Sequence, residues 1–235
     1  PITAGQIQVN GRNARRQRPR RADYLLRVGV NFPIAVVEAK RRHKRAADGI
    51  QQAKFYAQQL QLKFAYASNG AEILEVDLET GEERFIDRYP SPNELLFRLT
   101  RYEGWSAHTL SELLKPLRPF PEKPLRYYQE IAIHRATRAL LEGRDRLLLT
   151  LATGTGKTMV AFQIAWKLWE NRWTRRGTGF RPKILFLADR DVLVSDPYNK
   201  EFEAFGKHRC LLTDGFTTSK DLCFGTYQSL MAESQ

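Results

Sequence analysis

The stretch LLLTLATGTGKT, from Leu147 to Thr158, limits the possible folds of this chain more than any other. It places an apolar run, a glycine-rich turn and a Lys-Thr pair in succession, and good helix formers follow. Gly154 and Gly156 let the backbone curl so that its N–H groups face an anion at a helix N-terminus. In such a loop Lys157 reaches the outer phosphates of a nucleotide, and Thr158 gives its hydroxyl to Mg²⁺. We therefore expect nucleotide contacts from Thr153, Gly154, Thr155, Gly156, Lys157 and Thr158.

The second half of the chain alternates short apolar strands with helices. The predicted strands are RLLLTL (146–151), KILFLAD (183–189) and DLCFGTY (221–227), and the predicted helices cover about residues 128–142 and 158–173. This alternation is typical of a parallel, doubly wound α/β sheet. We therefore expect residues 125–235 to form an α/β domain that binds a nucleotide.

The first half of the chain follows a different pattern. ADYLLRVGVNFPIAVVEAK (22–40) predicts two strands joined by a short turn, and good helix formers follow over residues 46–62. A short strand, KFAYAS, and a hairpin around Thr80-Gly81 come next. Four prolines then lie in KPLRPFPEKP. We therefore predict a first domain at 1–98 and a Pro-rich linker at 99–124.

The second of the two strands predicted at 22–40 ends in Glu38 and Lys40. Residues two apart on a strand point to the same face of a sheet. Asp23 stands at the start of the preceding strand, so a hairpin would bring it next to Glu38. Two adjacent carboxylates are costly unless a divalent cation neutralises them. A Mg²⁺ held by Asp23 and Glu38, with Lys40 beside it, would stabilise the charge on a scissile phosphate, while the structural alternative is a solvated strand end.

Two further features favour a nucleic-acid site. Gln52 and Tyr56 are spaced i and i+4 on the following helix, so they lie on one helix face. The chain carries a net charge of +12, which favours a polyanionic partner such as DNA. A solvated basic surface is the alternative for these cations. Those nearest the acidic residues are Arg15, Arg16, Arg18, Arg20, Arg21, Arg41, Arg42, Lys44 and Arg45.

The spacing of these acids resembles a known nuclease superfamily. Asp23, Glu38 and Lys40 fit the Asp-(x)14-Glu-x-Lys pattern of PD-(D/E)xK nucleases, with Ala22 in place of the usual proline. A Gln-x-x-x-Tyr helix after Glu-x-Lys is found in the exonuclease-like branch of that superfamily. The resemblance implies that Gln52 and Tyr56 support the active site and contact DNA.

The second half resembles superfamily 2 helicases and translocases. There, an aromatic residue and a glutamine upstream of the phosphate loop contact adenine. In LRYYQ this implies that Gln129 reads the base edge, with Tyr127 or Tyr128 stacking and Arg126 beside them. Two downstream segments, ILFLADRDVLVSDP and FGTYQSL, resemble segments that contact the DNA backbone. The phosphate contacts implied there are Arg190, Thr226 and Gln228.

The order of these motifs closely resembles the N-terminal half of the restriction (motor) subunit of type I restriction–modification enzymes. The resemblance extends from about Arg12 to Leu230. It implies a PD-(D/E)xK nuclease-like mixed sheet, then an incomplete RecA-like, doubly wound parallel sheet. It implies ATP and Mg²⁺ as cofactors, and double-stranded DNA, a methyltransferase subunit and a specificity subunit as partners. The superfamily's Asp-Glu box does not occur up to Gln235, so we expect a fragment that binds ATP without hydrolysing it efficiently.

Other functions fit the same residues. One is a stand-alone defence or repair helicase–nuclease fusion, and another is a DNA-binding module with an inactive nuclease fold, which Ala22 keeps open. A protein of the membrane surface is disfavoured, because no basic amphipathic helix occurs and no apolar run approaches the roughly 20 residues of a membrane span. Cys210 and Cys223 lack metal-type spacing, and we expect a cytoplasmic protein.

Overall fold

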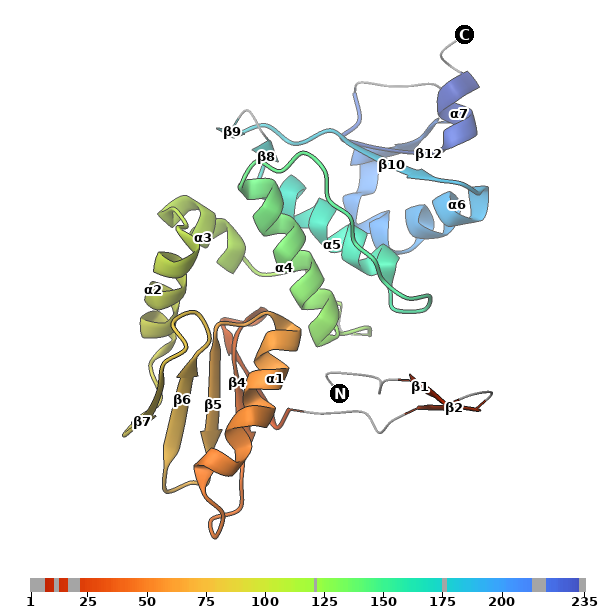
Figure 1. Cartoon of the computed structure of the whole chain (residues 1–235). Coiled ribbons are helices and arrows are strands. Elements are labelled where there is room, and N and C mark those ends of the chain that lie inside the picture. Colours follow the sequence, from red (N-terminus) through yellow and green to blue (C-terminus); the bar gives the residue numbers. More distant parts are fainter. Residues whose placement is uncertain are drawn as a thin grey trace. The chain divides into compact units, whose positions relative to one another are not determined.

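A computed structural model describes residues 7–10, 13–16, 22–120, 122–174, 177–212 and 219–232. The chain divides into two compact units, each with its own sheet (Figure 1). The first unit consists of residues 1–116 and 126–131, and the second of residues 117–125 and 132–235. Among the described residues no helix is both long enough and apolar enough to cross a membrane.

The first unit is built on a five-stranded mixed sheet of order β3-β4-β5-β6-β7. β4 pairs in parallel with β5, and the other neighbours are antiparallel. This confirms the two predicted hairpins. The strands of the sheet are β3 (Tyr24–Val28), β4 (Phe32–Ala39), β5 (Phe64–Ser68), β6 (Ile73–Asp77) and β7 (Glu83–Ile86). Two short strands precede it and pair with each other, β1 (Ile7–Asn10) and β2 (Asn13–Arg16).

Helix α1 (Ile50–Leu60) covers one face of this sheet, after the 3-10 turn η1 (Ala46–Gly49). The helix ends at Gln61, which adopts the left-handed conformation. Its apolar face packs against small and branched side chains of three strands. The buried cluster comprises Val36, Ala46, Ile50, Ala53, Tyr56, Ala57, Leu60, Ala65, Ala67, Leu74 and Val76. The small residues of β5 let α1 approach the sheet closely.

Helix α2 (Pro92–Glu103) packs against the opposite face, where Tyr102 lies near Phe64. A second helix, α3 (Ala107–Leu114), follows it. The predicted linker at 99–124 is therefore corrected, because this stretch contains the end of α2 and the whole of α3. The linker prediction rested on the four prolines of this stretch, which all lie after α3.

The second unit contains a parallel sheet of order β10-β12-β11. Its core is aromatic, with Phe162 and Trp169 of α5 packed against Phe202, Phe205 and Phe224. The elements of this part are α4 (Tyr127–Leu141), α5 (Lys157–Glu170), β8 (Trp173–Thr174), β9 (Gly177–Thr178), β10 (Ile184–Ala188), α6 (Asp191–Asn199), η2 (Glu201–His208), β11 (Arg209–Leu211), β12 (Leu222–Thr226) and α7 (Tyr227–Ala232). The first turn of α4 belongs to the first unit and the rest to the second.

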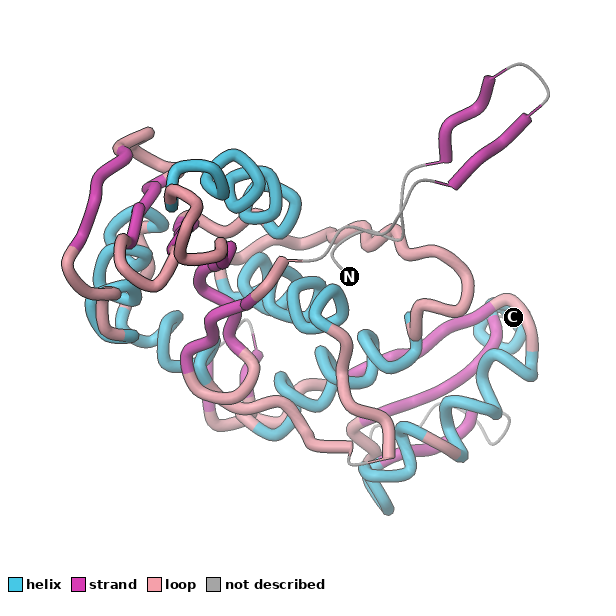
Figure 2. Tube along the Cα trace, turned by 90° about the horizontal axis from the view of Figure 1, so that it is seen from below, coloured by secondary structure: helices cyan, strands magenta, loops and turns pink. Residues whose placement is uncertain are grey.

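One predicted strand is absent from the described structure. Residues 146–151, RLLLTL, form neither strand nor helix, and Leu148 is 90% exposed. The segment lies in the long connection between α4 and α5, green in Figure 1 and a loop in Figure 2. A buried parallel strand needs a hydrogen-bonded neighbour, and the three described strands of this sheet pair only with one another. The prediction of a buried strand at this place is therefore wrong for the structure.

Candidate functional site

Two antiparallel strands of the first unit bring Asp23 and Glu38 together. Tyr24 of β3 pairs with Val37 of β4, so Asp23, one residue earlier, lies beside Glu38. Asp23 Oδ2 accepts a hydrogen bond of 2.7 Å from the backbone N–H of Ala39. This bond continues the hairpin past its last paired residues and holds both carboxylates at the end of β4.

Lys40 connects Glu38 to the helix that covers the sheet. Lys40 Nζ donates to Glu38 Oε1 over 2.9 Å and to Gln52 Oε1 over 3.3 Å. Gln52 Nε2 in turn donates to the Tyr56 hydroxyl over 2.9 Å, one turn further along α1. The backbone N–H of Lys40 donates to Ser68 O of β5 over 2.7 Å, which fixes the start of this side chain. The five predicted catalytic residues are thus gathered at one edge of the sheet, while their roles stay predictions.

Glu38 is a buried carboxylate with an incomplete set of hydrogen bonds. Its relative exposure is 3%, and its Oε2 has no hydrogen-bond partner among the described residues. Burial raises the pKa of Glu38 above its ordinary value, the hydrogen bond from Lys40 opposes this rise, and the charge of Asp23 adds to it. A buried acid beside a second acid is costly without sufficient positive charge. The geometry therefore favours a further cation at this place.

Asp23 and Glu38 fit Mg²⁺ in their donor chemistry. Both offer carboxylate oxygens, which hard cations prefer, and Glu38 Oε2 is the unsatisfied one. Within the described ranges, no three or more His, Cys, Asp or Glu residues form a group that could hold a metal ion. Mg²⁺ usually keeps several waters and binds through one or two carboxylates, so this pair suits it.

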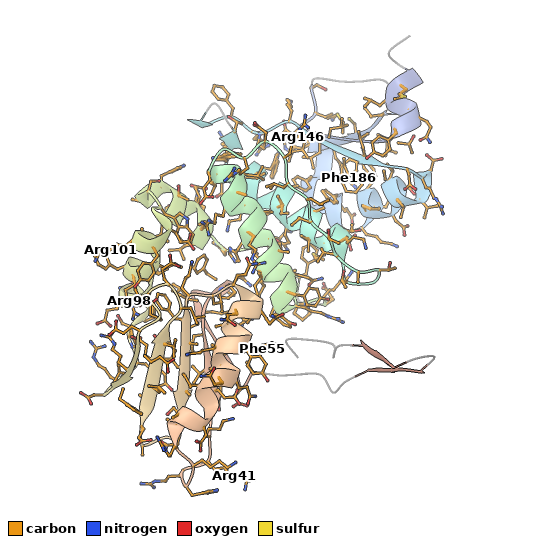
Figure 3. The ribbon with its side chains drawn as sticks, viewed as in Figure 1. Arg41, Phe55, Arg98, Arg101, Arg146 and Phe186 are labelled. Carbon is orange, nitrogen blue, oxygen red and sulfur yellow. The ribbon has the colours of Figure 1, made fainter. Side chains whose placement is uncertain are left out.

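Exposed cations follow this edge of the sheet. The loop after Lys40 carries four of them, Arg41, Arg42, Lys44 and Arg45. Arg41, labelled in Figure 3, projects from the end of the first unit beyond the strands. Cations in this position suit the phosphates of a nucleic acid. The predicted cations Arg15, Arg16, Arg18, Arg20 and Arg21 have side chains that lie outside the described residues.

A second acidic pair lies on the opposite face of the same sheet. Glu75 and Asp77 are 1% and 2% exposed. Arg98 of α2, labelled in Figure 3, donates to Glu75 over 2.9 Å and to Asp77 over 2.7 Å. The hydroxyls of Tyr66 and Tyr102 donate to the same two acids. This pair is neutralised inside the fold and is a structural cluster. The sequence pattern does not reveal this cluster, because acids at every second position of a strand also indicate a face exposed to solvent.

The glycine-rich loop of the second unit has the predicted backbone. Gly154 and Gly156 have φ angles of +76° and +81°, a region that glycine enters without steric cost. α5 begins directly after Gly156 with no side-chain cap, so its first N–H groups are available to a ligand. Lys157 Nζ donates to Leu151 O over 3.0 Å and to Ala152 O over 3.1 Å, so this side chain folds back over the loop.

The threonines of the loop differ in their surroundings. Thr153 is exposed, and Thr158 is half-buried in the first turn of α5. Thr155 Oγ1 donates to Ala152 O over 2.5 Å, which closes the turn of the loop. Thr155 therefore has a structural contact already, and the nucleotide contacts of all three stay predictions.

The predicted adenine-contacting residues lie at the start of α4, in the part assigned to the first unit. Gln129 is 7% exposed, and its Oε1 accepts from the backbone N–H of Arg126 over 2.9 Å. Arg126 also lies 3.4 Å from the Tyr128 hydroxyl. The same turn is anchored by Glu130, which accepts from Arg27 over 2.8 Å. Gln129 thus stabilises the helix start, and its contact with adenine stays a prediction.

The two predicted DNA-contacting segments lie at strand ends of the second unit. The Arg190 side chain is 81% exposed at the start of α6, and Gln228 is exposed on α7. Thr226 is 7% exposed, and its Oγ1 accepts from the backbone N–H of Ser229 over 3.2 Å. Arg190 and Gln228 are therefore accessible to a ligand, whereas Thr226 caps a helix.

Comparison with known proteins places the chain in a family. Residues 3–84 match the family described as "Type I restriction enzyme R protein N terminus", and residues 122–235 match "Type III restriction enzyme, res subunit". The type I restriction enzyme EcoAI endonuclease subunit of Escherichia coli is 35% identical over 86% of the chain. The chain belongs to the family of type I restriction enzyme R subunits.

Two further relatives of the R-subunit family agree with this placement. The EcoKI endonuclease subunit of Escherichia coli K12 is 26% identical over 89% of the chain. A solved fragment, described as an HsdR subunit of a type I restriction enzyme from Vibrio vulnificus YJ016, is 47% identical over 97% of the chain, with a TM-score of 0.79. The chain spans 25% of the EcoAI subunit, 22% of the EcoKI subunit and 41% of the solved chain. The mixed sheet followed by a parallel sheet is therefore a known R-subunit arrangement.

Proposed function

We propose that this chain forms the nuclease and first motor portion of a subunit that translocates duplex DNA with ATP and cuts it with Mg²⁺. The observation that carries the proposal is the arrangement of Asp23, Glu38 and Lys40 at one sheet edge, with Glu38 Oε2 buried and without a partner in the described part of the chain. In the same sheet, Glu75 and Asp77 are neutralised by Arg98 of the protein itself and need no added cation.

The roles of the residues follow from their bonds. Asp23 and Glu38 would hold Mg²⁺, which when bound supplies positive charge that activates water and offsets charge on the phosphate. Lys40 would donate to a phosphate oxygen or to the attacking water from a fixed place. Gln52 keeps the ammonium group of Lys40 near Glu38, and Tyr56 orients the Gln52 amide.

Nicking of supercoiled plasmid with Mg²⁺ or Mn²⁺ tests the nuclease. We expect Glu38→Gln and Lys40→Met each to lower the nicking rate at least about a hundredfold, because each removes a charge at the reacting phosphate. Gel shifts should show that both variants still bind DNA, since the exposed arginines after Lys40 are retained. Glu82→Gln, at an acid whose side chain is 59% exposed in the same unit, serves as the matched control and should nick like the parent.

The outcome also separates the competing functions. A chain that binds DNA without cutting it, with or without these changes, would support a DNA-binding module with an inactive nuclease fold. Nicking that survives Glu38→Gln would place the active site elsewhere.

We propose ATP as the nucleotide and a methyltransferase and a specificity subunit as partners. Support for ATP comes from the two positive-φ glycines and from Lys157 at the start of α5. Support for the partners comes from the relatives, which are named as endonuclease subunits of type I enzymes. Co-purification with those two subunits would favour this assembly, and a chain that stays alone in their presence would favour a stand-alone helicase–nuclease fusion.

A further inference from the structure

Gly49 joins η1 to α1 and is buried against the sheet edge that carries Lys40. Its φ of −96° and ψ of −16° lie in the right-handed helical region. Any L-residue can adopt this conformation. The backbone therefore does not require glycine here, unlike the turn at Gly154, where φ is +76°.

Space is what excludes a side chain at Gly49. A Cβ atom there would lie 2.9 Å from Lys40 Cε, 3.2 Å from Glu38 Cγ and 3.3 Å from Ala67 Cβ. Carbon atoms in favourable contact are about 3.5–4.0 Å apart, so all three neighbours are too close. The missing side chain thus lets the start of α1 lie close enough to the strand ends for Gln52 to reach Lys40.

We propose that Gly49 is a positioning residue for Lys40 in phosphodiester cleavage, because it leaves the room in which the Lys40 side chain bridges Glu38 and Gln52. This inference rests on the nuclease function proposed above. It adds to that site a residue without any functional group, which acts only through the space it leaves.

The three neighbours of Gly49 differ in their freedom to move. Ala67 is fully buried in β5, and Glu38 is buried in β4, so the sheet fixes both. The Lys40 contact atom lies near the free end of a long side chain that is 18% exposed. An added methyl group at position 49 would therefore displace the end of Lys40, whose contact is the shortest. The contacts with Glu38 and Ala67 need only a small shift at the start of α1, so the sheet keeps its place. Gly49→Ala should impair cleavage much more than folding.

Three measurements on Gly49→Ala in the whole chain test this inference. They are the rate of plasmid nicking with Mn²⁺ at saturating DNA, the Kd for DNA by gel shift, and the melting temperature. We expect nicking to fall about 10- to 100-fold, as for a small misplacement of a catalytic group, with the Kd and the melting temperature close to those of the parent. Gln51→Ala, at an exposed position of the same helix turn, is the matched control and should keep all three values.

Gln52→Ala provides a second test without added volume. It removes the partner that holds Lys40, so Gly49→Ala and Gln52→Ala together should slow nicking no more than the stronger single change. Effects that multiply would overturn the inference, because the two residues would then act separately. Unchanged nicking by Gly49→Ala would also overturn the inference, because Lys40 would then work without the space at Gly49. Loss of the folded state would overturn it too, because the added methyl group would then disturb the whole fold and not Lys40.

A crystal structure of Gly49→Ala separates this inference from the nuclease proposal. We expect Lys40 Nζ to have left Gln52 while β4 and β5 are unchanged. If the parent chain does not cut DNA, the nuclease proposal fails, yet a displaced Lys40 still supports the spatial role of Gly49. A Lys40 that keeps both bonds beside the new methyl group would overturn that role.

Discussion

At the scale of single residues, charge balance distinguishes the two acidic pairs of the first unit. Burial by itself would raise the pKa values of Glu75 and Asp77. Hydrogen bonds from Arg98, Tyr66 and Arg84 hold the pKa of Glu75 below its ordinary value, and hydrogen bonds from Tyr102 and Arg98 do the same for the pKa of Asp77. Glu38 is bonded to one cation, Lys40, and burial keeps its pKa raised. The same sheet thus carries one acidic pair that is complete within the protein and one that suits an added cation.

Arg98→Met removes the cation that Glu75 and Asp77 share and keeps most of the side-chain volume. We expect the free energy of unfolding of the first unit to fall by about 3–5 kcal/mol, because buried Asp77 loses the Arg98 cation and buried Glu75 keeps only that of Arg84. Urea unfolding measures this change. Arg101→Met, at an exposed arginine of the same helix, should change stability by less than about 0.5 kcal/mol. Equal losses from both changes would contradict the structural role of the cluster.

The directions of these pKa shifts also determine how the stability loss of Arg98→Met depends on pH. Glu75 and Asp77 have folded pKa values below the unfolded values of about 4, so their contribution to stability is present above that pH and is lost as pH falls through the folded values. Without Arg98, burial favours the protonated acids. The difference in the free energy of unfolding between the parent and Arg98→Met should therefore shrink as pH falls from about 7 to about 4. Melting temperatures over this range measure it, and a constant difference would argue against the assignment.

At the scale of elements, α2 owes its start to a local cap. Ser91 Oγ accepts from the backbone N–H of Glu94 over 3.2 Å, and Glu94 Oε2 accepts from the backbone N–H of Ser91 over 2.6 Å. Pro92 occupies the first helical position, where its missing N–H costs nothing. This cap sets where α2 begins and hence where Arg98 meets the sheet.

Ser91→Ala should lower the free energy of unfolding by about 1 kcal/mol, the usual cost of a lost N-cap. The measurement is urea unfolding followed by circular dichroism. Asn93→Ala, an exposed change in the same turn, is the control and should alter stability by less than about 0.5 kcal/mol. No difference between the two variants would mean that packing alone fixes the start of α2.

At the scale of the whole molecule, each compact unit has its own apolar core. We therefore expect two calorimetric transitions, of which Arg98→Met lowers the one that belongs to the first unit. Mg-ATP should raise the melting temperature of the second unit, because a hundredfold excess of ligand over Kd adds about 2.7 kcal/mol to the free energy of unfolding. Lys157→Ala should abolish this rise. Lys200→Ala, at a lysine whose side chain is 64% exposed, should keep it, and a full rise in Lys157→Ala would count against the phosphate loop.

The sequence by itself determined the features that depend on neighbours along the chain. Strand alternation and turn residues predicted the two hairpins, and the spacing of Asp23, Glu38 and Lys40 predicted that a hairpin would bring the acids together. Two glycines and a Lys-Thr pair predicted the backbone of the loop before α5. These features are local, because each depends on backbone preferences and side-chain periods that a short segment carries within itself.

Only the tertiary structure decided the features that depend on residues distant in sequence. The apolar run at 146–151 pairs with no described strand, and a local pattern cannot show whether a strand finds a neighbour. Arg98 meets Glu75 and Asp77 only because α2 packs on that face of the sheet. The closeness of Gly49 to Lys40 likewise arises from the packing of α1 on β4 and β5. Packing sets distances between elements, and a sequence pattern sets only the faces that those elements present.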